Sequence, residues 1–306
     1  MSKVQSLSPV INTSFSTTWR AYYEITKPRV VALLVLTALV GMCLSTANVI
    51  PWQILLPSIL GIGLLSSAAA AINHIVDEKI DALMKRTHHR PLPNGKITSQ
   101  QAIVFALSLA ILGFITLYLW VNALTAWLTF AGLVGYSFIY TLYLKRATPQ
   151  NITIGGLAGA IPPLLGWTAI TNEIEANALL LVLIIFTWTP PHFWALAIHR
   201  KEDYAKVNIP MLPVTHGNDF TKTQILLYTV LLFIVCLLPY LVGMSNWLYL
   251  LGAVVLNSVF FAYAWKLKFK AEKNTAMDTF KFSIIHLMTL FVILLADHYL
   301  LPVTRI

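Results

Sequence analysis

Nine long apolar runs, separated by short polar connections, constrain the fold of this chain more than any other feature. Each run has roughly 18 or more mostly apolar residues, the length that crosses about 30 Å of hydrocarbon as a helix. Runs of this kind predict helices, because backbone groups cannot stay unpaired in lipid and barrel strands are shorter and alternate. We expect an all-α polytopic membrane protein with nine transmembrane helices. The runs lie near residues 30–48, 53–75, 101–119, 122–143, 152–170, 177–198, 224–243, 247–265 and 282–302.

Composition excludes a soluble protein. Hydrophobic residues make up 58% of the chain and charged residues only 11%, whereas globular domains have about a quarter charged residues. We expect one nine-helix domain over residues 21–306, preceded at residues 1–20 by a mobile leader rich in Ser and Thr. That leader has no apolar segment typical of a cleaved signal peptide. Cys43 and Cys236 fall inside apolar runs without metal-ligand spacing, which predicts small buried side chains.

The basic residues predict the orientation of the chain. Of 21 Lys and Arg residues, only Arg305 falls outside the connections on one side, and such residues mark the cytoplasmic side. The N-terminus is therefore expected inside and the C-terminus outside, most simply in a bacterial cytoplasmic (inner) membrane. The net charge of +9 needs no nucleic acid, because orientation and contacts with lipid headgroups account for it.

An oxygen-bearing pattern occupies the end of the second run. Asn73, Asp77 and Asp81 are spaced i, i+4 and i+8, so each step advances about 40° and the three side chains share one helix face. Successive groups are about 6 Å apart along the axis, which lets a hard cation such as Mg²⁺ join the carboxylates to a phosphorylated ligand. We call this set the oxygen ladder. The alternative is the solvated end of a helix.

A basic loop follows the oxygen ladder. Arg86 and Arg90 follow the ladder in a Pro-containing loop, where arginine forks match phosphate oxygens, or they serve only as orientation signals. His88 and His89, in the same loop, are expected to be surface residues.

The small residues 155–160, before two prolines, lack the context of a phosphate loop and predict close helix packing followed by a kink.

The connection after the sixth run forms a second polar motif. Glu202 and Asp203 there can bring another cation, and Arg200 and Lys201 can neutralise phosphate charge. Similar clusters are also common next to any membrane span. His192 and His199 are seven residues apart, about two turns, so the spacing predicts a shared face.

Together these motifs resemble the UbiA superfamily of intramembrane prenyltransferases, over about residues 24–302. The ladder with Arg86 and Arg90 is similar to the first signature of that superfamily. In the second motif, His192 and His199 stand where quinone-pathway members have aspartates, while Glu202 and Asp203 keep later acidic positions. This departure, with the segments Lys27-Pro28-Arg29, Lys145-Arg146-x-Thr148-Pro149-x-Asn151 and Ile209-Pro210-Met211-Leu212-Pro213, resembles the haem-farnesylating branch.

The resemblance implies transfer of the farnesyl group of farnesyl diphosphate to a vinyl group of haem B with addition of water, giving haem O and diphosphate. It implies Mg²⁺ on Asp77 and Asp81 with support from Asn73, and His192 or His199 as a haem ligand or a wall residue. It also implies a link to a haem A synthase or a terminal-oxidase assembly pathway. The basic residues expected to bind diphosphate or haem propionates are Lys27, Arg29, Lys145, Arg146, Arg200 and Lys201.

Three alternatives remain open at this point. One is a prenyltransferase for another acceptor, such as a quinone precursor. Another is a membrane transporter that uses Asp77 and Asp81 for ion coupling, although two arginines beside the ladder have no obvious role in such a protein. The last is a haem-binding or assembly protein without diphosphate chemistry.

Overall fold

Helices and turns make up the described chain. The computed structural model describes residues 15–84 and 87–301, and no strand occurs within these ranges, which confirms the all-α prediction. The elements are α1 (Phe15–Ile25), α2 (Pro28–Leu44), α3 (Trp52–Asp81), α4 (Ser99–Trp120), α5 (Ala123–Val134), the π-helix η1 (Gly135–Leu144), α6 (Lys145–Ala147), α7 (Asn151–Ala160), α8 (Pro162–Thr171), α9 (Ala176–His199), α10 (Lys201–Lys206), α11 (Leu212–Thr215), α12 (Gly217–Leu241), α13 (Trp247–Phe269) and α14 (Thr275–Leu300).

Eight of the described helical segments are long and apolar enough to cross a membrane. One of them, Ala123–Ala147, combines α5, η1 and α6, and another, Asn151–Thr171, combines α7 and α8. Helix α2 has 17 residues and follows α1 across a 50° bend, and this bent pair provides a ninth crossing if it counts as one span. The described chain therefore has eight to nine spans, against nine predicted.

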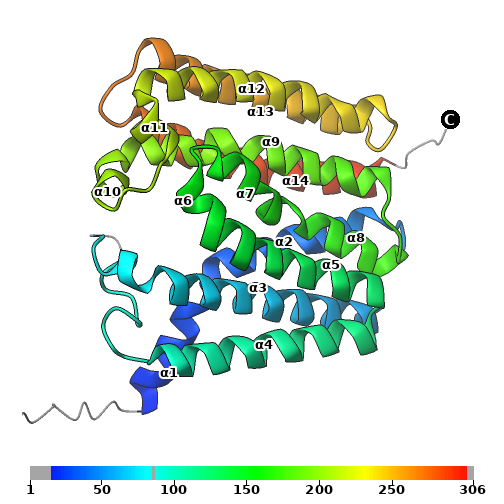
Figure 1. Cartoon of the computed structure of the whole chain (residues 1–306). Helices are drawn as coiled ribbons and strands as arrows, with labels where there is room; N and C mark the ends of the chain where they lie inside the picture. The colour runs from blue at the N-terminus through cyan, green and yellow to red at the C-terminus, as the bar shows by residue number, and fades with distance from the viewer. Residues whose placement is uncertain (1–14, 85–86, 302–306) are drawn as a thin grey trace, which may run out of the picture.

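The helices are stacked in layers (Figure 1). Helices α12 and α13 form one layer, α9 and α14 lie next to them, and α3 and α4 lie on the opposite side of the molecule. One apolar cluster joins α9, α12, α13 and α14 around Leu181, Leu232 and Phe260, and another joins α3 to α4 around Ile62 and Leu117. Helix α1, the loop after α3, and α10 and α11 gather at the left-hand end of Figure 1. The basic connections thus share one end, as the charge distribution predicted.

Helix α1 begins at Phe15, inside the segment expected to be a mobile leader. Ala21 and Ile25 are buried in a cluster with residues of α3, α4 and the loop between them. On the other side of the helix, Trp19 and Tyr23 are 67% and 57% exposed. One buried side and one exposed aromatic side make this an amphipathic helix, which periodicity over so short a segment did not single out. The residues before Phe15 lie outside the described part of the chain.

The small residues of α7 allow the close packing that the sequence predicted. A Cβ on Gly155 would lie 2.1 Å from the ring of Tyr140 in η1, and one on Gly156 would lie 2.7 Å from Thr189 in α9. The segment is therefore a packing surface between two helices and not a phosphate loop. Helix α7 ends at Ala160, two positions before Pro162, where the predicted interruption occurs.

Candidate active site

The oxygen ladder lies at the end of α3 and is buried. Asn73, Asp77 and Asp81 are 4%, 2% and 3% exposed. The Nδ2 atom of Asn73 donates to Oδ2 of Asp77 at 3.2 Å, which confirms that these two side chains share a face. A solvated helix end is therefore excluded. Two carboxylates buried this closely require compensating positive charge.

Lysines from two other segments supply part of that charge. Nζ of Lys145, at the start of α6, lies 2.5 Å from Oδ2 of Asp77. Nζ of Lys27, between α1 and α2, donates to Oδ1 of Asn73. Two of the six basic residues expected at an anion site thus reach the ladder directly.

Arg90 reaches the ladder from the loop after α3. Its NH1 atom lies 2.6 Å from Oδ2 of Asp81, and the Thr87 hydroxyl in the same loop donates to the backbone oxygen of Asp81 at 3.1 Å. Arg86, expected to act beside Arg90, lies outside the described residues. Together with Lys27 and Lys145, Arg90 makes three basic groups beside the two carboxylates of the ladder. The excess positive charge favours an anionic ligand at this end of the bundle.

The break between α1 and α2 brings Lys27 to the ladder. Its backbone is left-handed, with φ 51° and ψ 58°, a sparsely populated conformation for a residue with a side chain. Pro28 starts α2, where its missing N–H would have no helical partner. The carbonyl of Lys27 accepts from the N–H groups of Val30 and Val31 at 2.9 and 3.1 Å. Lys27 is therefore the N-cap residue of α2 and fixes the change of direction.

A π-helix, which the sequence did not predict, completes the wall opposite α3. The hydroxyl of Thr141 donates to the carbonyl of Tyr136 five residues earlier at 2.8 Å and accepts from Nδ2 of Asn73 at 3.4 Å. Since η1 runs directly into α6, the same turn brings Lys145 toward Asp77. Short π segments occur frequently at functional sites. No motif in residues 135–144 indicates this helix type.

The histidines of the second polar motif have different environments. His192 is buried within α9, and its Nδ1 lies 2.6 Å from Oγ of Ser283 in α14. His199 ends α9 and is exposed. His192 is therefore the histidine of this motif that faces the interior, whereas the side chain of His199, in the last turn, is exposed. Ser283 was missed by sequence reasoning, since nothing in its local sequence distinguishes it from other hydroxyls in apolar helices.

The charged part of this motif lies near the surface. The NH1 atom of Arg200 lies 3.7 Å from Oδ2 of Asp203. Lys201 is half-buried and Glu202 is exposed. Within residues 15–84 and 87–301, no group of three His, Cys, Asp or Glu side chains is close enough to hold a metal. The expectation that Glu202 and Asp203 can bring another cation therefore stays a prediction. His88 and His89 are exposed, as predicted.

The donor chemistry of the ladder fits Mg²⁺. Oδ1 of Asp77 is buried and has no hydrogen-bond partner among the described residues, so one carboxylate oxygen is available to a cation. Magnesium typically takes one or two carboxylates and completes its shell with water and substrate phosphates. Asp77, Asp81 and the amide oxygen of Asn73 provide such a partial set.

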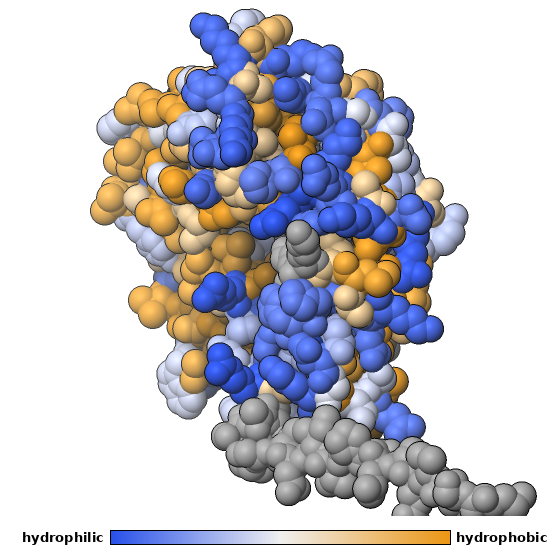
Figure 2. All heavy atoms as spheres, turned by 90° about the vertical axis from the view of Figure 1, so that its left-hand side faces the viewer, coloured by the Kyte–Doolittle hydropathy of each residue, from blue (hydrophilic) through white to orange (hydrophobic). Residues whose placement is uncertain are grey.

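The surface around this end of the bundle is polar. Figure 2 shows hydrophilic side chains gathered over this face, with hydrophobic side chains on its flanks. Arg29 and Arg146, two of the other residues expected to bind anions, are exposed. Among the described residues, the basic contacts of the ladder come from Lys27, Arg90 and Lys145, and not from Arg29 or Arg146.

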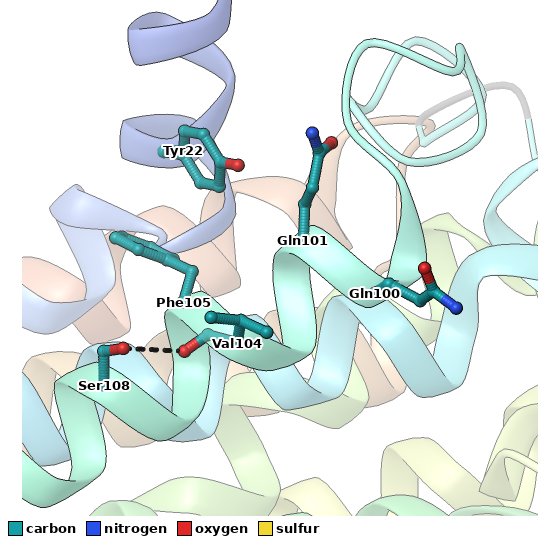
Figure 3. A pocket seen from close by; sticks show the side chains of 6 residues that line it. All are labelled: Tyr22, Gln100, Gln101, Val104, Phe105 and Ser108. Carbon is teal, nitrogen blue, oxygen red and sulfur yellow. Dashed lines mark hydrogen bonds between the residues drawn. The ribbon is translucent and has the colours of Figure 1, made fainter.

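A groove of about 440 Å³ lies elsewhere, between α1 and α4 (Figure 3). The ring of Tyr22 lies near that of Phe105, with centroids 4.9 Å apart, and the hydroxyl of Ser108 donates to the carbonyl of Val104 at 2.9 Å. None of its lining residues is charged. A diphosphate is therefore better matched by the ladder than by this groove. The lining residues are Tyr22, Gln100, Gln101, Val104, Phe105 and Ser108.

The fold and the site together define a polytopic membrane protein with two buried carboxylates, each paired with a basic side chain, at one end of its helices. Residues 34–290 match the UbiA prenyltransferase family, and the chain belongs to this family. The resemblance predicted from the ladder and the second motif is thereby confirmed, and the chain is an integral membrane prenyltransferase.

Similar curated proteins extend over almost the whole chain. A protein of Colwellia psychrerythraea named protoheme IX farnesyltransferase is 80% identical over 93% of this chain and 93% of its own. One of Pseudoalteromonas atlantica, named protoheme IX farnesyltransferase 2, is 66% identical over 98% of this chain and 99% of its own.

Solved structures show the same fold at low identity. A structure from work on digeranylgeranylglyceryl phosphate synthase in membranes has a TM-score of 0.78 and 21% identity, over 93% of this chain and 99% of that chain. A UbiA homologue from Archaeoglobus fulgidus, bound to DMAPP and Mg²⁺, has a TM-score of 0.61 and 15% identity, over 90% and 99%.

Proposed function

We propose that the chain is a haem O synthase, a Mg²⁺-dependent protohaem IX farnesyltransferase. It transfers the farnesyl group of farnesyl diphosphate to a vinyl group of haem B, with addition of water, and yields haem O and diphosphate. The observation that carries this proposal is identity of 61–80% over 92–98% of the chain to relatives named protoheme IX farnesyltransferase. The buried ladder and its basic partners supply a matching diphosphate site.

The proposed chemistry begins with binding of the diphosphate at the ladder. Lys27, Lys145 and Arg90 turn from the ladder oxygens toward phosphate oxygens, with Arg86 of the same loop assisting. Asp77, Asp81 and Asn73 would hold Mg²⁺, which when bound would supply positive charge to stabilise the leaving diphosphate. As the C–O bond to the allylic carbon breaks, both bonding electrons remain with the diphosphate, and the basic side chains stabilise them.

The second stage takes place in the apolar part of the bundle. The vinyl group of haem B attacks the allylic carbon and forms the new C–C bond. Water then adds to the cation left beside the porphyrin ring and releases a proton. No protein nucleophile takes part. Apolar walls delay water until the C–C bond has formed.

Basic residues at the mouth are proposed to bind the haem propionates. Arg29, Arg146, Arg200 and Lys201 are exposed or half-buried at the polar end of the bundle. Lys27, Arg90 and Lys145, which contact the ladder, lie deeper than these four residues. This difference favours diphosphate binding by the three ladder partners and propionate binding by the four residues at the mouth. In this arrangement both anionic ends of the substrates enter from the same side.

The proposed location is a bacterial cytoplasmic membrane, with the N-terminus and the mouth of the site on the cytoplasmic side and the C-terminus outside. The gathering of basic connections at one end of the bundle supports this orientation. The product would pass to a haem A synthase or to a terminal-oxidase assembly pathway. Lipid headgroups surround the same polar rim.

The test uses membranes that contain the full chain, incubated with haem B, farnesyl diphosphate and Mg²⁺. We expect a product with the mass of haem O, and loss of that product for Asp77→Asn or Asp81→Asn with the protein still folded. Asp219→Asn is a matched control, because Asp219 also pairs with a lysine but is exposed. Absence of the product beside an active control enzyme would overturn the assignment, and a prenylated quinone precursor in its place would select the other acceptor.

A further inference from the structure

The ring of His192 is held on both faces. The ring of Trp188, one turn earlier in α9, is stacked on it with centroids 4.2 Å apart and planes at 20°. Phe280 of α14 lies on it at 4.5 Å and 30°, and Phe193 meets it edge-on at 4.8 Å and 80°. A histidine clamped by aromatic rings in this way has one available plane, so its two nitrogens point in fixed directions.

Ser283 settles which of those nitrogens carries the proton. Its hydroxyl donates to the carbonyl of Phe280 at 2.6 Å, and a hydroxyl has a single hydrogen to donate. The 2.6 Å contact between Oγ of Ser283 and Nδ1 of His192 must then be donated by the histidine. The ring is accordingly the Nδ1–H tautomer, and Nε2 keeps a lone pair.

Ser283 also fixes the height of the ring. Its backbone carbonyl accepts from Nε1 of Trp188 at 2.8 Å, so one residue of α14 binds two rings of α9 that are one turn apart. Nε2 of His192 has no hydrogen-bond partner among the described residues. Nε2 of His192 is thus held in a defined position, and its lone pair is available to a ligand.

His192 lies about two turns inside the end of its helix. It lies seven residues before His199, the last residue of α9, which is about 10 Å of helix. Asn73 lies eight residues before the end of α3 at Asp81, about 12 Å of helix. Each of the two side chains is therefore set back by a similar distance from the end of its own helix.

We propose that Nε2 of His192 is an axial ligand to the iron of the acceptor haem, and that Ser283 is the positioning residue that fixes its tautomer and direction. This inference rests on the proposed function. Metal-binding histidines characteristically donate their other N–H to a fixed acceptor, which is the part that Ser283 plays here. Ligation pins the centre of the porphyrin and so fixes how far its vinyl groups lie from Nε2, while the propionate contacts proposed above would set its rotation.

The hydrogen-bond acceptor of His192, the hydroxyl of Ser283, suits a haem that is a substrate better than a haem that stays bound as a cofactor. A carboxylate at Nδ1 would raise the basicity of the ligand, whereas a neutral hydroxyl does so less. Among the described residues, the hydrogen bond of His192 goes to a hydroxyl. The expected iron bond is therefore weak enough for the farnesylated product to leave.

The test titrates the full chain, in detergent, with ferric haem B and follows the absorption spectrum. The wild type is expected to show the spectrum of a histidine-ligated haem. His192→Ala is expected to lose that spectrum and regain it when imidazole is added. Ser283→Ala is expected to bind haem about tenfold or more weakly, with a raised KM for haem and an unchanged KM for farnesyl diphosphate.

Two variants provide controls. Thr279→Ala removes another buried hydroxyl of α14, one turn away, which donates to the carbonyl of Thr275 at 2.8 Å. His216→Ala removes an exposed histidine. Both are expected to behave as the wild type does.

Identical haem spectra for the wild type and His192→Ala would overturn the proposal. Equal effects of Ser283→Ala and Thr279→Ala would also overturn it, and this comparison decides the matter if His192→Ala does not fold. Failure of the proposed function is seen separately, as absence of farnesylated haem in the wild-type assay, whatever the titration shows.

Discussion

The pair formed by Asp77 and Lys145 gives a quantitative test of the site. Oδ2 of Asp77 and Nζ of Lys145 are 2.5 Å apart, and their side chains are 3% and 14% exposed. Asp77→Asn keeps the shape of the side chain and removes its charge, while Lys145→Met keeps much of the apolar stem. The two single variants and the double variant form a cycle that isolates the interaction between the side chains.

The expected coupling follows from burial and geometry. A hydrogen bond between charged groups contributes about 1.5–3 kcal/mol, and the buried carboxylate places this pair toward the upper part of that range. Each single variant leaves the other charge without its partner, so each should lower the free energy of unfolding by a similar amount. The double variant should then cost less than the sum of the two.

Equilibrium denaturation in mixed detergent micelles, with a chelator present, measures these free energies. The pair of Asp219 and Lys268, 2.7 Å apart, is a matched cycle in which the carboxylate is exposed, so screening by water should leave a coupling clearly smaller than that of the buried pair. In the transfer assay, Asp77→Asn and the double variant should be inactive, whereas Lys145→Met should raise the KM for farnesyl diphosphate. Additive stability effects at Asp77 and Lys145, or an active Asp77→Asn, would refute the reasoning.

Three further predictions concern packing, the arginine and the metal. Gly166→Ala should destabilise the protein by about 1–3 kcal/mol or more, because its Cβ would lie 1.8 Å from the carbonyl oxygen of Ala38. Thermal unfolding beside Gly132→Ala, where nothing lies within 4 Å, checks this, and equal losses would contradict it. Arg90→Lys should raise the KM for farnesyl diphosphate, since lysine keeps the charge but loses the fork, and steady-state kinetics equal to those of the wild type would rule this out. Removal of divalent cations with EDTA should stop the transfer and added Mg²⁺ should restore it; full activity in EDTA would argue against the metal.

The sequence predicted those parts of the site that depend on one helix alone. The spacing of Asn73 and Asp77 determines their common face, and a hydrogen bond between them confirms it. The small residues of α7 predicted close packing, which the contacts of Gly155 and Gly156 confirm. Such features follow from the period of a helix and need no knowledge of its neighbours.

Features that depend on how helices are turned against each other were not predictable. Charge alone left Lys27 and Lys145 as either orientation signals or site residues. The bend between α1 and α2 places Lys27 beside α3, and the π-helix η1 places Lys145 beside it. The spacing of His192 and His199 predicted a common face but not that His192 is buried and His199 exposed. Ser283 lies 91 positions from its partner His192, beyond the reach of any local pattern.

We expect the bend before α2 to link turnover to the thickness of the surrounding bilayer. Helix α1 exposes Trp19 and Tyr23, aromatic side chains of the kind that settle at the level of lipid headgroups. Since Lys27 joins this helix to the ladder, a bilayer that is too thin or too thick would shift α1 and with it Lys27, which we propose binds the diphosphate. Turnover in vesicles of graded acyl-chain length is therefore expected to pass through an optimum.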